Sequence, residues 1–335
     1  MITVAVDGMG GDNAPACMVQ GAVDAINKNS SIKVLLTGRP DDLNKALEGL
    51  TYDKSRLEIV PASEVIETGA PPVESVRTKK DSSLVVGLKL VKEQKADAFV
   101  SCGSTGAVLV GGQLIAGKIK GVKRAPLAPV IPTVNGAMLL VDCGANVDAR
   151  AEQLVQFAKM GSIYMENVVG IKNPRVGIVN IGAEEEKGNA LVKETFPLLK
   201  ECDEINFIGS VEARDIPSGV CDVIVCEAFV GNVILKLYEG VGATLISKVK
   251  EGMMGSLRTK IGALLVKPAL KKTLKSFDAS AYGGAPLLGL NGLVVKSHGS
   301  SKALEIQNSI IQCVQFKQQK INEKIKEHIA LINKK

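Results

Sequence analysis

The stretch Val4-Ala5-Val6-Asp7-Gly8-Met9-Gly10-Gly11-Asp12-Asn13-Ala14-Pro15 decides which fold this sequence predicts. A short apolar run gives way to glycines, two aspartates and a proline, and a helical pattern follows, which is typical of a strand that ends in a loop before a helix. In open α/β sheets, ligands bind in the loops beyond the carboxyl ends of the strands. Glycines in such a loop expose backbone N–H groups to an anion, although a plain tight turn would use them equally well. The aspartates on either side of the glycines favour a binding site.

The composition is that of an α/β protein with a large core. The chain has 335 residues, of which 46% are hydrophobic and only 3% aromatic, and this is enough for one large unit or two closely packed ones. The net charge of +6 permits an anionic partner, but there is no tryptophan to stack on bases, so we expect no nucleic-acid partner. The seven cysteines show no paired spacing and no basic segment precedes the first apolar run, which favours a cytoplasmic protein with reduced thiols.

Strand and helix patterns alternate along the chain, without an internal repeat. Strands are expected at 2–6, 32–37, 57–61, 97–101, 137–142, 175–181, 205–210, 222–226 and 293–297. Helices are expected at about 15–29, 40–49, 81–95, 104–117, 150–167, 187–200, 229–254 and 300–332. This alternation predicts a mainly parallel sheet with helices on both faces. The proline-rich segment 121–136 is expected to be a crossover or a long loop, and residues 1–335 are expected to form one catalytic α/β unit with interleaved lobes.

Familiar nucleotide, metal and membrane motifs are incomplete. The first turn lacks the spacing of a dinucleotide fingerprint, and residues 112–118 are followed by Ile119 where a P-loop needs Ser or Thr. With two histidines and no paired cysteines, a zinc site has little support. The uncharged stretch 98–117 carries several polar residues and glycines, which fit a strand, a turn and a buried helix better than a membrane span. These motifs therefore predict no nucleotide cofactor and no zinc site.

Polar residues beside glycine follow several predicted strands. They are Ser101-Cys102-Gly103-Ser104-Thr105-Gly106, Asp142-Cys143-Gly144-Ala145-Asn146, Asn180-Ile181-Gly182, Gly231-Asn232 and His298-Gly299-Ser300-Ser301. Each of these motifs alone is common in loops. Parallel strands bring their carboxyl ends to one edge of the sheet, so the five motifs together predict a binding site there. His298 is expected at this edge, with a structural role as the alternative, and His328 at the surface or an interface. Cys102 and Cys143 are expected to be buried and unreactive, since no base is near them in sequence.

Together, the first stretch and His298-Gly299-Ser300-Ser301 resemble the PlsX family, the phosphate acyltransferases of bacterial phospholipid synthesis. Further matches follow in order along nearly the whole chain: Arg77-Thr78-Lys79-Lys80-Asp81-Ser82-Ser83, Val141-Asp142-Cys143-Gly144-Ala145-Asn146, Asn180-Ile181-Gly182, Lys187-Gly188-Asn189, Phe229-Val230-Gly231-Asn232 and Tyr282-Gly283-Gly284-Ala285-Pro286-Leu287-Leu288-Gly289. The departures from the family pattern are Ser104 for a usual Asn, Cys102 for a small inert residue, Ala125-Pro126 for Pro-Ala and Glu227-Ala228 for Asp-Gly. They leave the roles of residues 104 and 227 open.

The resemblance implies transfer of a fatty acyl group from acyl carrier protein to inorganic phosphate, which gives an acyl phosphate. It also implies a three-layer α/β/α fold like that of isocitrate and isopropylmalate dehydrogenases, a homodimer, kinship with phosphotransacetylase and no redox cofactor. A downstream glycerol-3-phosphate acyltransferase is a further candidate partner. The alternatives are transfer from acyl-CoA, a decarboxylating dehydrogenase and a non-catalytic membrane scaffold. The dehydrogenase would need NAD and a metal, and the sequence lacks a convincing cluster of metal carboxylates.

Phosphate is already a nucleophile, so the protein has to hold it near the thioester carbonyl and stabilise the developing oxyanion. The residues expected to act in catalysis are His298, Asp7, Asn232 and Lys236. The residues expected to bind phosphate or substrate are Gly8, Gly10, Gly11, Asp12, Lys80, Ser101, Ser104, Thr105, Asp142, Asn146, Asn180, Lys187, Gly283, Gly284, Ser300 and Ser301. His298 would orient phosphate or protonate the departing thiolate, and Asp7 and Asp12 would orient a donor or a cation, magnesium included.

Residues 240–290 are expected to contain a protruding, basic, amphipathic helical segment. Residues 256–277 hold six lysines and arginines and no acidic residue. The apolar stripe comprises Leu257, Ile261, Leu264 and Leu265 and, beyond an expected interruption at Pro268, Leu270, Leu274 and Phe277. Such a pattern is typical of helices that lie on an anionic membrane surface, and packing on a partner subunit is the alternative. The residues expected to make either contact are Leu257, Ile261, Leu265, Lys267 and Lys271.

Overall fold

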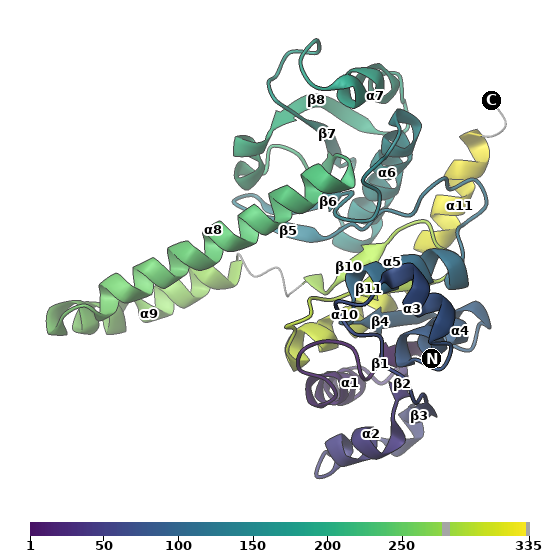
Figure 1. The fold of residues 1–335 in the computed structure, drawn as a ribbon. Helices are drawn as coiled ribbons and strands as arrows, with labels where there is room; N and C mark the ends of the chain where they lie inside the picture. The colour runs from purple at the N-terminus through teal and green to yellow at the C-terminus, as the bar shows by residue number, and fades with distance from the viewer. Residues whose placement is uncertain (277–281, 333–335) are drawn as a thin grey trace.

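A computed structural model of the chain describes residues 1–276 and 282–332, and Phe277 lies outside them (Figure 1). The strands form two mostly parallel sheets with helices on their faces, which confirms the expected three-layer α/β architecture. The sequence pattern predicts one sheet, whereas the structure divides its strands between two. Alternating strands and helices specify parallel pairing, but they do not specify where one sheet ends and the next begins.

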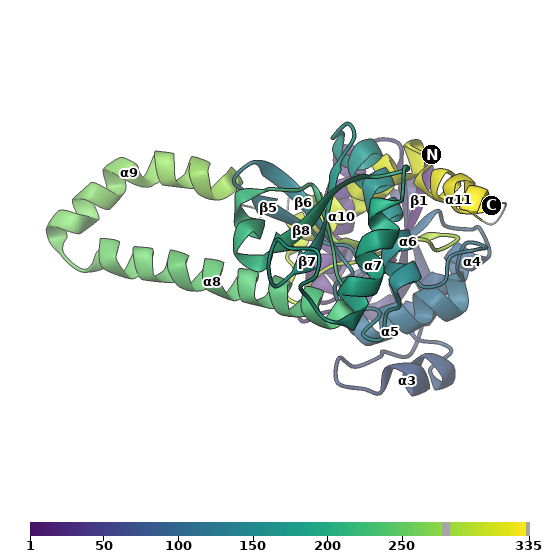
Figure 2. The same cartoon turned by 90° about the horizontal axis from the view of Figure 1, so that it is seen from above.

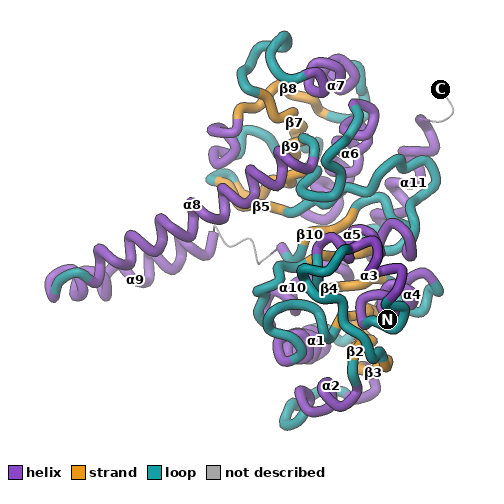
Figure 3. The backbone as a smooth tube through the Cα atoms, in the orientation of Figure 1, coloured by secondary structure: helices purple, strands orange, loops and turns teal. Residues whose placement is uncertain are grey.

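The first sheet has six strands and the second has five. In spatial order the first consists of β10 (Ala285–Leu287), β11 (Leu293–Lys296), β4 (Ala98–Ser101), β1 (Ile2–Asp7), β2 (Ile32–Gly38) and β3 (Leu57–Pro61), and only β10 is antiparallel. The second consists of β5 (Val130–Thr133), β6 (Gly136–Val141), β9 (Val223–Val225), β7 (Arg175–Asn180) and β8 (Asn206–Glu212), and only β5 is antiparallel. The chain thus leaves the first sheet after β4 and returns to it at β10 (Figure 3).

The helices alternate with these strands. They are α1 (Ala16–Lys28), α2 (Pro40–Leu47), α3 (Pro72–Thr78), α4 (Ser83–Lys92), α5 (Thr105–Gly111), α6 (Ala151–Tyr164), α7 (Ala190–Lys200), α8 (Ala228–Met254), α9 (Leu257–Ser276), α10 (Ala303–Gln318) and α11 (Ile321–Ile332). Every strand predicted from the sequence is present, while β5, β10 and α3 were not predicted. The segment 121–136 contains β5, and the helix expected at 300–332 is divided by Lys320, which has a positive φ of 53°.

Side-chain alternation along β1 explains the layers around the first sheet. Val4 and Val6 point into one core with α1 and α10, while Ala5 points into another with α4 and α5. The first of these cores continues to Leu139 of β6 and Phe157 of α6, so the two sheets share buried apolar contacts.

A short antiparallel bridge joins the two sheets. Leu127, just before β5, pairs with Leu287 at the end of β10. The backbone N–H of Cys143, after β6, donates to the Leu127 carbonyl oxygen at 2.9 Å. This junction brings the carboxyl ends of strands from both sheets to the same place.

The helices α8 and α9 extend from the body as a hairpin (Figure 2). Glu227 caps α8 by accepting two N–H bonds from its first turn at 2.7 and 2.9 Å. At the tip, the Ser256 hydroxyl accepts the Thr259 N–H, and the Thr259 hydroxyl accepts the Ser256 N–H, which starts α9. The prediction that Pro268 interrupts this helix is wrong, because α9 continues through it. A proline removes one backbone donor, and the flanking turns here remain helical.

Candidate active site

A pocket of about 590 Å³ lies where the ends of β4, β6 and β11 meet β5 and the first turns of α8. The expected site residues that line it are Thr105, Asn232, Lys236, Gly283, Gly284, His298 and Ser301. They come from segments beside the first sheet and from α8, and the second sheet adds the β5 segment and Cys143, so the pocket exists only in the folded chain. Its position beyond the carboxyl ends of parallel strands is where the sequence predicts a site.

The two motifs that carry the family resemblance are joined directly beside this pocket. The Asp12 N–H donates to the Gly299 carbonyl oxygen at 2.8 Å. The Asn13 side chain donates to the carbonyl oxygens of Ser300 and Ser301 at 3.1 and 3.2 Å. The glycine-rich loop therefore fixes the backbone that presents His298.

The His298 side chain is exposed at the pocket and held by Ser300. Its Nδ1 lies 2.8 Å from the Ser300 hydroxyl and accepts the Ser300 N–H at 3.3 Å. In the neutral ring the proton therefore belongs on Nε2, which is free to donate to a bound molecule. The arrangement suits hydrogen bonding to an anion or proton donation to a leaving group.

Two lysines line the polar end of the pocket in different environments. Lys236 on α8 is exposed, and its Nζ pairs with Glu239 at 2.8 Å. Lys296, the last residue of β11, is buried and contacts the Ser297 carbonyl oxygen. Burial lowers the pKa of Lys296 from its usual value. Sequence reasoning missed Lys296, although its place at the end of a buried strand, two residues before His298, was an available signal.

The opposite side of the pocket is apolar. Its walls are the β5 segment and one face of α8, with Leu127, Pro129, Val130, Ile131, Pro132, Leu235, Tyr238, Gly242, Ala243 and Ile246. The Tyr238 hydroxyl donates to the Pro132 carbonyl oxygen at 2.6 Å, which ties the two walls together. The small residues Gly242 and Ala243 leave room between the walls. A hydrocarbon chain suits such a surface.

Asp7, expected to act in catalysis, is instead buried beneath the pocket. Its carboxylate accepts the Ser101 hydroxyl at 2.7 Å and the Met9 N–H at 3.3 Å. Burial raises the pKa of Asp7, although these donors oppose the rise. Ser101 also accepts the Gly103 N–H at 3.0 Å. The pair therefore ties the loop after β1 to the loop after β4.

Asp142, just after β6 of the second sheet, is also buried and also accepts hydrogen bonds from neighbouring loops. Its carboxylate accepts the N–H groups of Leu127 and Ala145 at 2.9 and 3.2 Å and the Asn146 side chain at 2.6 Å. Asn146 also donates to the Ala125 carbonyl oxygen at 3.1 Å. Burial raises the pKa of Asp142. These contacts position the segment that leads into β5 and thus one wall of the pocket.

Close packing accounts for the glycines of the first loop. A Cβ at Gly10 would lie 2.4 Å from the Asp7 carboxylate, and one at Gly8 would lie 2.7 Å from Leu43. Gly11 has a φ of 101°, which other residues rarely adopt. The loop is thus packed against protein, and its glycines support the site from behind.

Gly283 and Gly284, by contrast, line the pocket itself. The Gly284 N–H donates to Gln312 of α10 at 3.1 Å, and the Gln312 amide donates back to the Gly284 carbonyl oxygen at 3.1 Å. Gly283 has a φ of 84°. This backbone segment is therefore held in place by α10.

Several expected site residues lie apart from the pocket. Asn180 donates to the Lys187 carbonyl oxygen and to Ser210, and Lys187 pairs with Glu184 at 2.8 Å. Lys80 is exposed after α3. Ser104 is buried, and its hydroxyl caps α5 by accepting the Ala107 N–H at 3.4 Å.

The two cysteines near the pocket are poor nucleophiles. Burial raises the pKa of both Cys102 and Cys143 to about 12. Cys143 lines the pocket, and its thiol contacts the Gly231 carbonyl oxygen at 3.4 Å. Because the thiolate is the reactive species, both thiols are unreactive at neutral pH.

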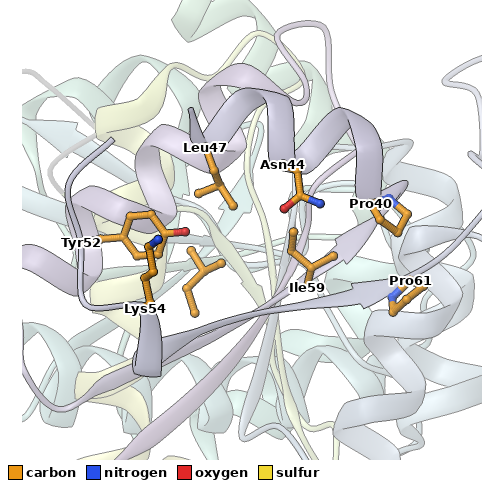
Figure 4. A pocket seen from close by; sticks show the side chains of 8 residues that line it. Pro40, Asn44, Leu47, Tyr52, Lys54, Ile59 and Pro61 are labelled. Atoms are coloured by element: carbon orange, nitrogen blue, oxygen red, sulfur yellow. The ribbon is translucent and has the colours of Figure 1, made fainter. Parts of the chain in front are cut away.

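A second cavity, of about 490 Å³, lies between α2 and β3 at the edge of the first sheet (Figure 4). Its walls include Leu47, Tyr52, Ile59 and Pro61, and Lys54 contributes the one charge among its lining side chains. It holds none of the expected site residues. Within residues 1–276 and 282–332, no cluster of three or more His, Cys, Asp or Glu could hold a metal ion.

The comparisons with known proteins agree with the motifs. Residues 2–324 match the family model described as "Fatty acid synthesis protein". A phosphate acyltransferase from Clostridium acetobutylicum is 49% identical over 330 residues, which cover 98% of this chain and 99% of that protein. The chain belongs to the PlsX family of phosphate acyltransferases. The PlsX resemblance inferred from the sequence is thereby confirmed.

Solved structures show the fold of this PlsX-family chain in other proteins. A phosphotransacetylase from Streptococcus pyogenes has a TM-score of 0.61 and 16% identity, with 94% of both chains covered. A 4-hydroxythreonine-4-phosphate dehydrogenase from Klebsiella pneumoniae has a TM-score of 0.50 and 12% identity, with 93% of this chain and 98% of that chain covered. At these identities the likeness concerns the fold alone, and it agrees with the expected dehydrogenase-like architecture.

The helix α8 is long and apolar enough to cross a membrane, judged by length and composition alone. It is the one such helix in the part of the PlsX-family chain that the structure describes. Its first turns are packed in the body, since a Cβ at Gly231 would lie 1.9 Å from the Asp142 carbonyl oxygen. The helix is thus anchored at one end, and only 6% of its most apolar window is buried.

Proposed function

We propose that the chain transfers a fatty acyl group from acyl carrier protein to inorganic phosphate, with an acyl phosphate and a thiol as products. The observation that carries this proposal is the division of one pocket into a polar end and an apolar side. Lys296, Lys236, Asn232 and His298 lie at the polar end, and the β5–α8 walls suit the hydrocarbon chain. Membership of the PlsX family supports the same class of reaction.

The chemistry needs no nucleophile from the protein. A phosphate oxygen attacks the thioester carbonyl carbon, the carbon–sulfur bond breaks, and the hydrogen that phosphate loses ends on the departing sulfur. Holding phosphate beside the carbonyl can contribute about 7–11 kcal/mol. The imidazolium form of His298 would give its Nε2 proton to the thiolate and regain a proton from the attacking phosphate, while its Nδ1–H donates to the Ser300 hydroxyl. Asn232 would donate to the developing oxyanion. Asp7 would act indirectly, through the loop that it fixes.

A direct assay tests this proposal and its main alternative, transfer from acyl-CoA. The purified protein is given palmitoyl-acyl carrier protein or palmitoyl-CoA, each with and without phosphate, and free thiol and acyl phosphate are measured. We expect phosphate-dependent release of thiol, with kcat/KM higher for the carrier-protein thioester. Higher kcat/KM for the CoA thioester would reverse the donor assignment. Absence of acyl phosphate with either donor would reject the reaction.

The hairpin supports a proposal about the assembly. Apolar side chains recur every four residues on α8 and remain exposed: Phe229, Val233, Leu237, Val241 and Leu245. Such a stripe exceeds the scattered apolar exposure of ordinary surfaces. We propose that it packs against a second copy of the chain in a homodimer. Sedimentation equilibrium tests this directly, since Leu237→Glu should shift the protein towards the monomer.

The tip of the hairpin supports peripheral attachment to a membrane. Leu257, Leu264 and Leu265 are more than 70% exposed, and the basic residues expected to face lipid, such as Lys267 and Lys271, lie on the same helix. We propose that the tip of the segment 240–290 binds the cytoplasmic surface of a membrane. Acyl phosphates are apolar and labile, so release beside the lipid and a glycerol-3-phosphate acyltransferase would limit their hydrolysis. The two sheets and the pocket would then remain in the cytoplasm, within the one catalytic unit expected for residues 1–335.

A further inference from the structure

The ammonium group of Lys296 is buried, and the described residues around it form no ion pair that would neutralise its positive charge. Lys296 ends β11, a central strand between β10 and β4, and is only 7% exposed. Its Nζ contacts the Ser297 carbonyl oxygen, and among the described residues it forms no ion pair within 4.0 Å. A buried ammonium without a counter-charge destabilises a fold. Its presence at a pocket wall therefore calls for a ligand that supplies the charge.

Lys236 and Lys296 line the same pocket, and within residues 1–276 and 282–332 only Lys236 has an acidic partner. Lys236 is exposed, and Glu239 neutralises it at 2.8 Å. Charged and titratable groups that act on Lys296 include Cys102, Lys236, Asp7 and Asp12, and Glu239 and Glu305 also line the pocket, but within the described residues none of them forms an ion pair with Lys296. Burial outweighs their combined effect and lowers the pKa of Lys296. An anion in the pocket would restore the charged form.

We infer that the Lys296 ammonium binds the phosphate that acts as nucleophile, and that His298 and Thr105 complete this subsite. The inference rests on the proposed function and adds to it the residue that holds the acceptor. The three side chains come from β11, the loop after it and the start of α5, and all line the same pocket. A dianion there supplies a counter-charge and accepts hydrogen bonds from the ammonium, for which the described residues provide one acceptor, the Ser297 carbonyl oxygen. It also lies next to the apolar side, where the acyl carbonyl must arrive.

Two effects of opposite sign distinguish this role from a structural one. Lys296→Met keeps an unbranched side chain that is shorter by only one heavy atom and removes the buried charge, so we expect unchanged or higher stability without phosphate. The same change should raise KM for phosphate by about 10- to 100-fold, since hydrogen bonds to charged groups are strong. A lysine needed only for packing would lower stability and leave KM for phosphate unchanged.

The experiment measures thermal unfolding and steady-state kinetics of the full chain as inorganic phosphate is varied. Phosphate should raise the midpoint of unfolding of the wild type in the absence of acyl donor, by preferential binding to the folded state. This rise should be lost in Lys296→Met and partly retained in Lys296→Arg. Lys302→Met is the matched control, because Lys302 is exposed at the same edge and does not line the pocket.

Each outcome decides the inference. It is overturned if Lys296→Met binds phosphate like the wild type, if Lys302→Met has the same effect, or if KM rises for the acyl donor alone. The last result would mean that Lys296 binds a phosphate group of the donor. Should Lys296→Met fail to fold, Lys296→Gln receives the same measurements, and failure of both contradicts the expected stability. The unfolding measurement needs no turnover, so it still decides the role of Lys296 if acyl transfer is absent.

Discussion

Asp7 and Asp142 are buried, whereas Asn232 and His298 face the pocket, although the sequence pattern places all four close to the ends of predicted strands. The aspartates are at most 2% exposed, and their oxygens accept hydrogen bonds from neighbouring loops. Asn232 and His298 are exposed to the pocket. The comparison shows that a polar residue near a strand end can either hold the loops of a site in position through hydrogen bonds or contact the ligand directly. Only the direction of the side chain separates the two roles.

The largest effect is expected at the pocket-facing histidine. His298→Ala should lower kcat by about 10²–10⁴-fold, because general acid catalysis typically contributes that much. Its stability should stay within about 0.5 kcal/mol of the wild type, since the side chain is exposed. Kinetics and urea unfolding measure both. His328→Ala, on α11, is the matched control and should leave both unchanged. Equal activity of the two variants would make His298 structural.

The buried carboxylates should show the reverse pattern. Asp142→Ala leaves the N–H groups of Leu127 and Ala145 without their acceptor, which should reduce the free energy of unfolding by roughly 2–4 kcal/mol. Urea unfolding measures the loss, and the exposed Asp148→Ala serves as control. If Asp142→Ala loses activity at full stability, the carboxylate belongs to the catalytic group and the comparison fails.

A third class of side chain lies at the tip of the α8–α9 hairpin, where apolar residues neither fill the core nor line the pocket. Leu265 is 76% exposed at the tip, so Leu265→Glu should abolish sedimentation with anionic vesicles and preserve activity on a soluble donor. Each basic residue near such a surface contributes about 1 kcal/mol, so binding of the wild type should weaken with salt. Ile208→Glu, on β8 of the body, is the matched control. Loss of the dimer in Leu265→Glu, or a wild type that does not sediment at low salt, would contradict the membrane proposal.

A smaller effect should appear in the pH dependence of stability. Burial raises the pKa of Asp7 above its ordinary value of 3.8, so the folded state holds this proton more tightly than the unfolded state. Its stabilising contribution is therefore complete below pH 3.8 and is lost as pH rises through the folded pKa. Asp7→Asn removes this titration. The stability of the wild type relative to Asp7→Asn should accordingly fall from acidic to neutral pH, and a constant difference would contradict the raised pKa.

The smallest effect is expected for the buried thiol. Cys102→Ala should keep activity within about twofold, because a thiol with a pKa of about 12 is protonated and cannot form an acyl-enzyme. Rapid-mixing measurements without phosphate should show no stoichiometric burst of thiol release in the wild type. A burst that Cys102→Ala abolishes would establish a covalent intermediate.

The candidate site was only partly predictable, for a reason that Asp7 illustrates. The sequence placed it after a strand and beside glycines, where a ligand-binding carboxylate would also stand. Its main partner, Ser101, is 94 residues away, and no local pattern shows that the two form a buried pair. Lys296 was missed although it ends a strand two residues before His298, because the sequence does not show which way that side chain points.

The sequence by itself determined the succession of strands and helices, the polar loops after the strands and membership of the PlsX family, because periodicity and motifs are properties of neighbouring residues. The tertiary structure decided that the strands form two sheets and that β5 and α8 wall a pocket between them. It also decided that Asp7 and Asp142 are enclosed while Lys296 is buried without an ion pair in the part of the chain that the structure describes. Whether a residue is buried and whether its charge is paired depend on the packing of segments far apart in the chain. The sequence of a single segment therefore shows neither property.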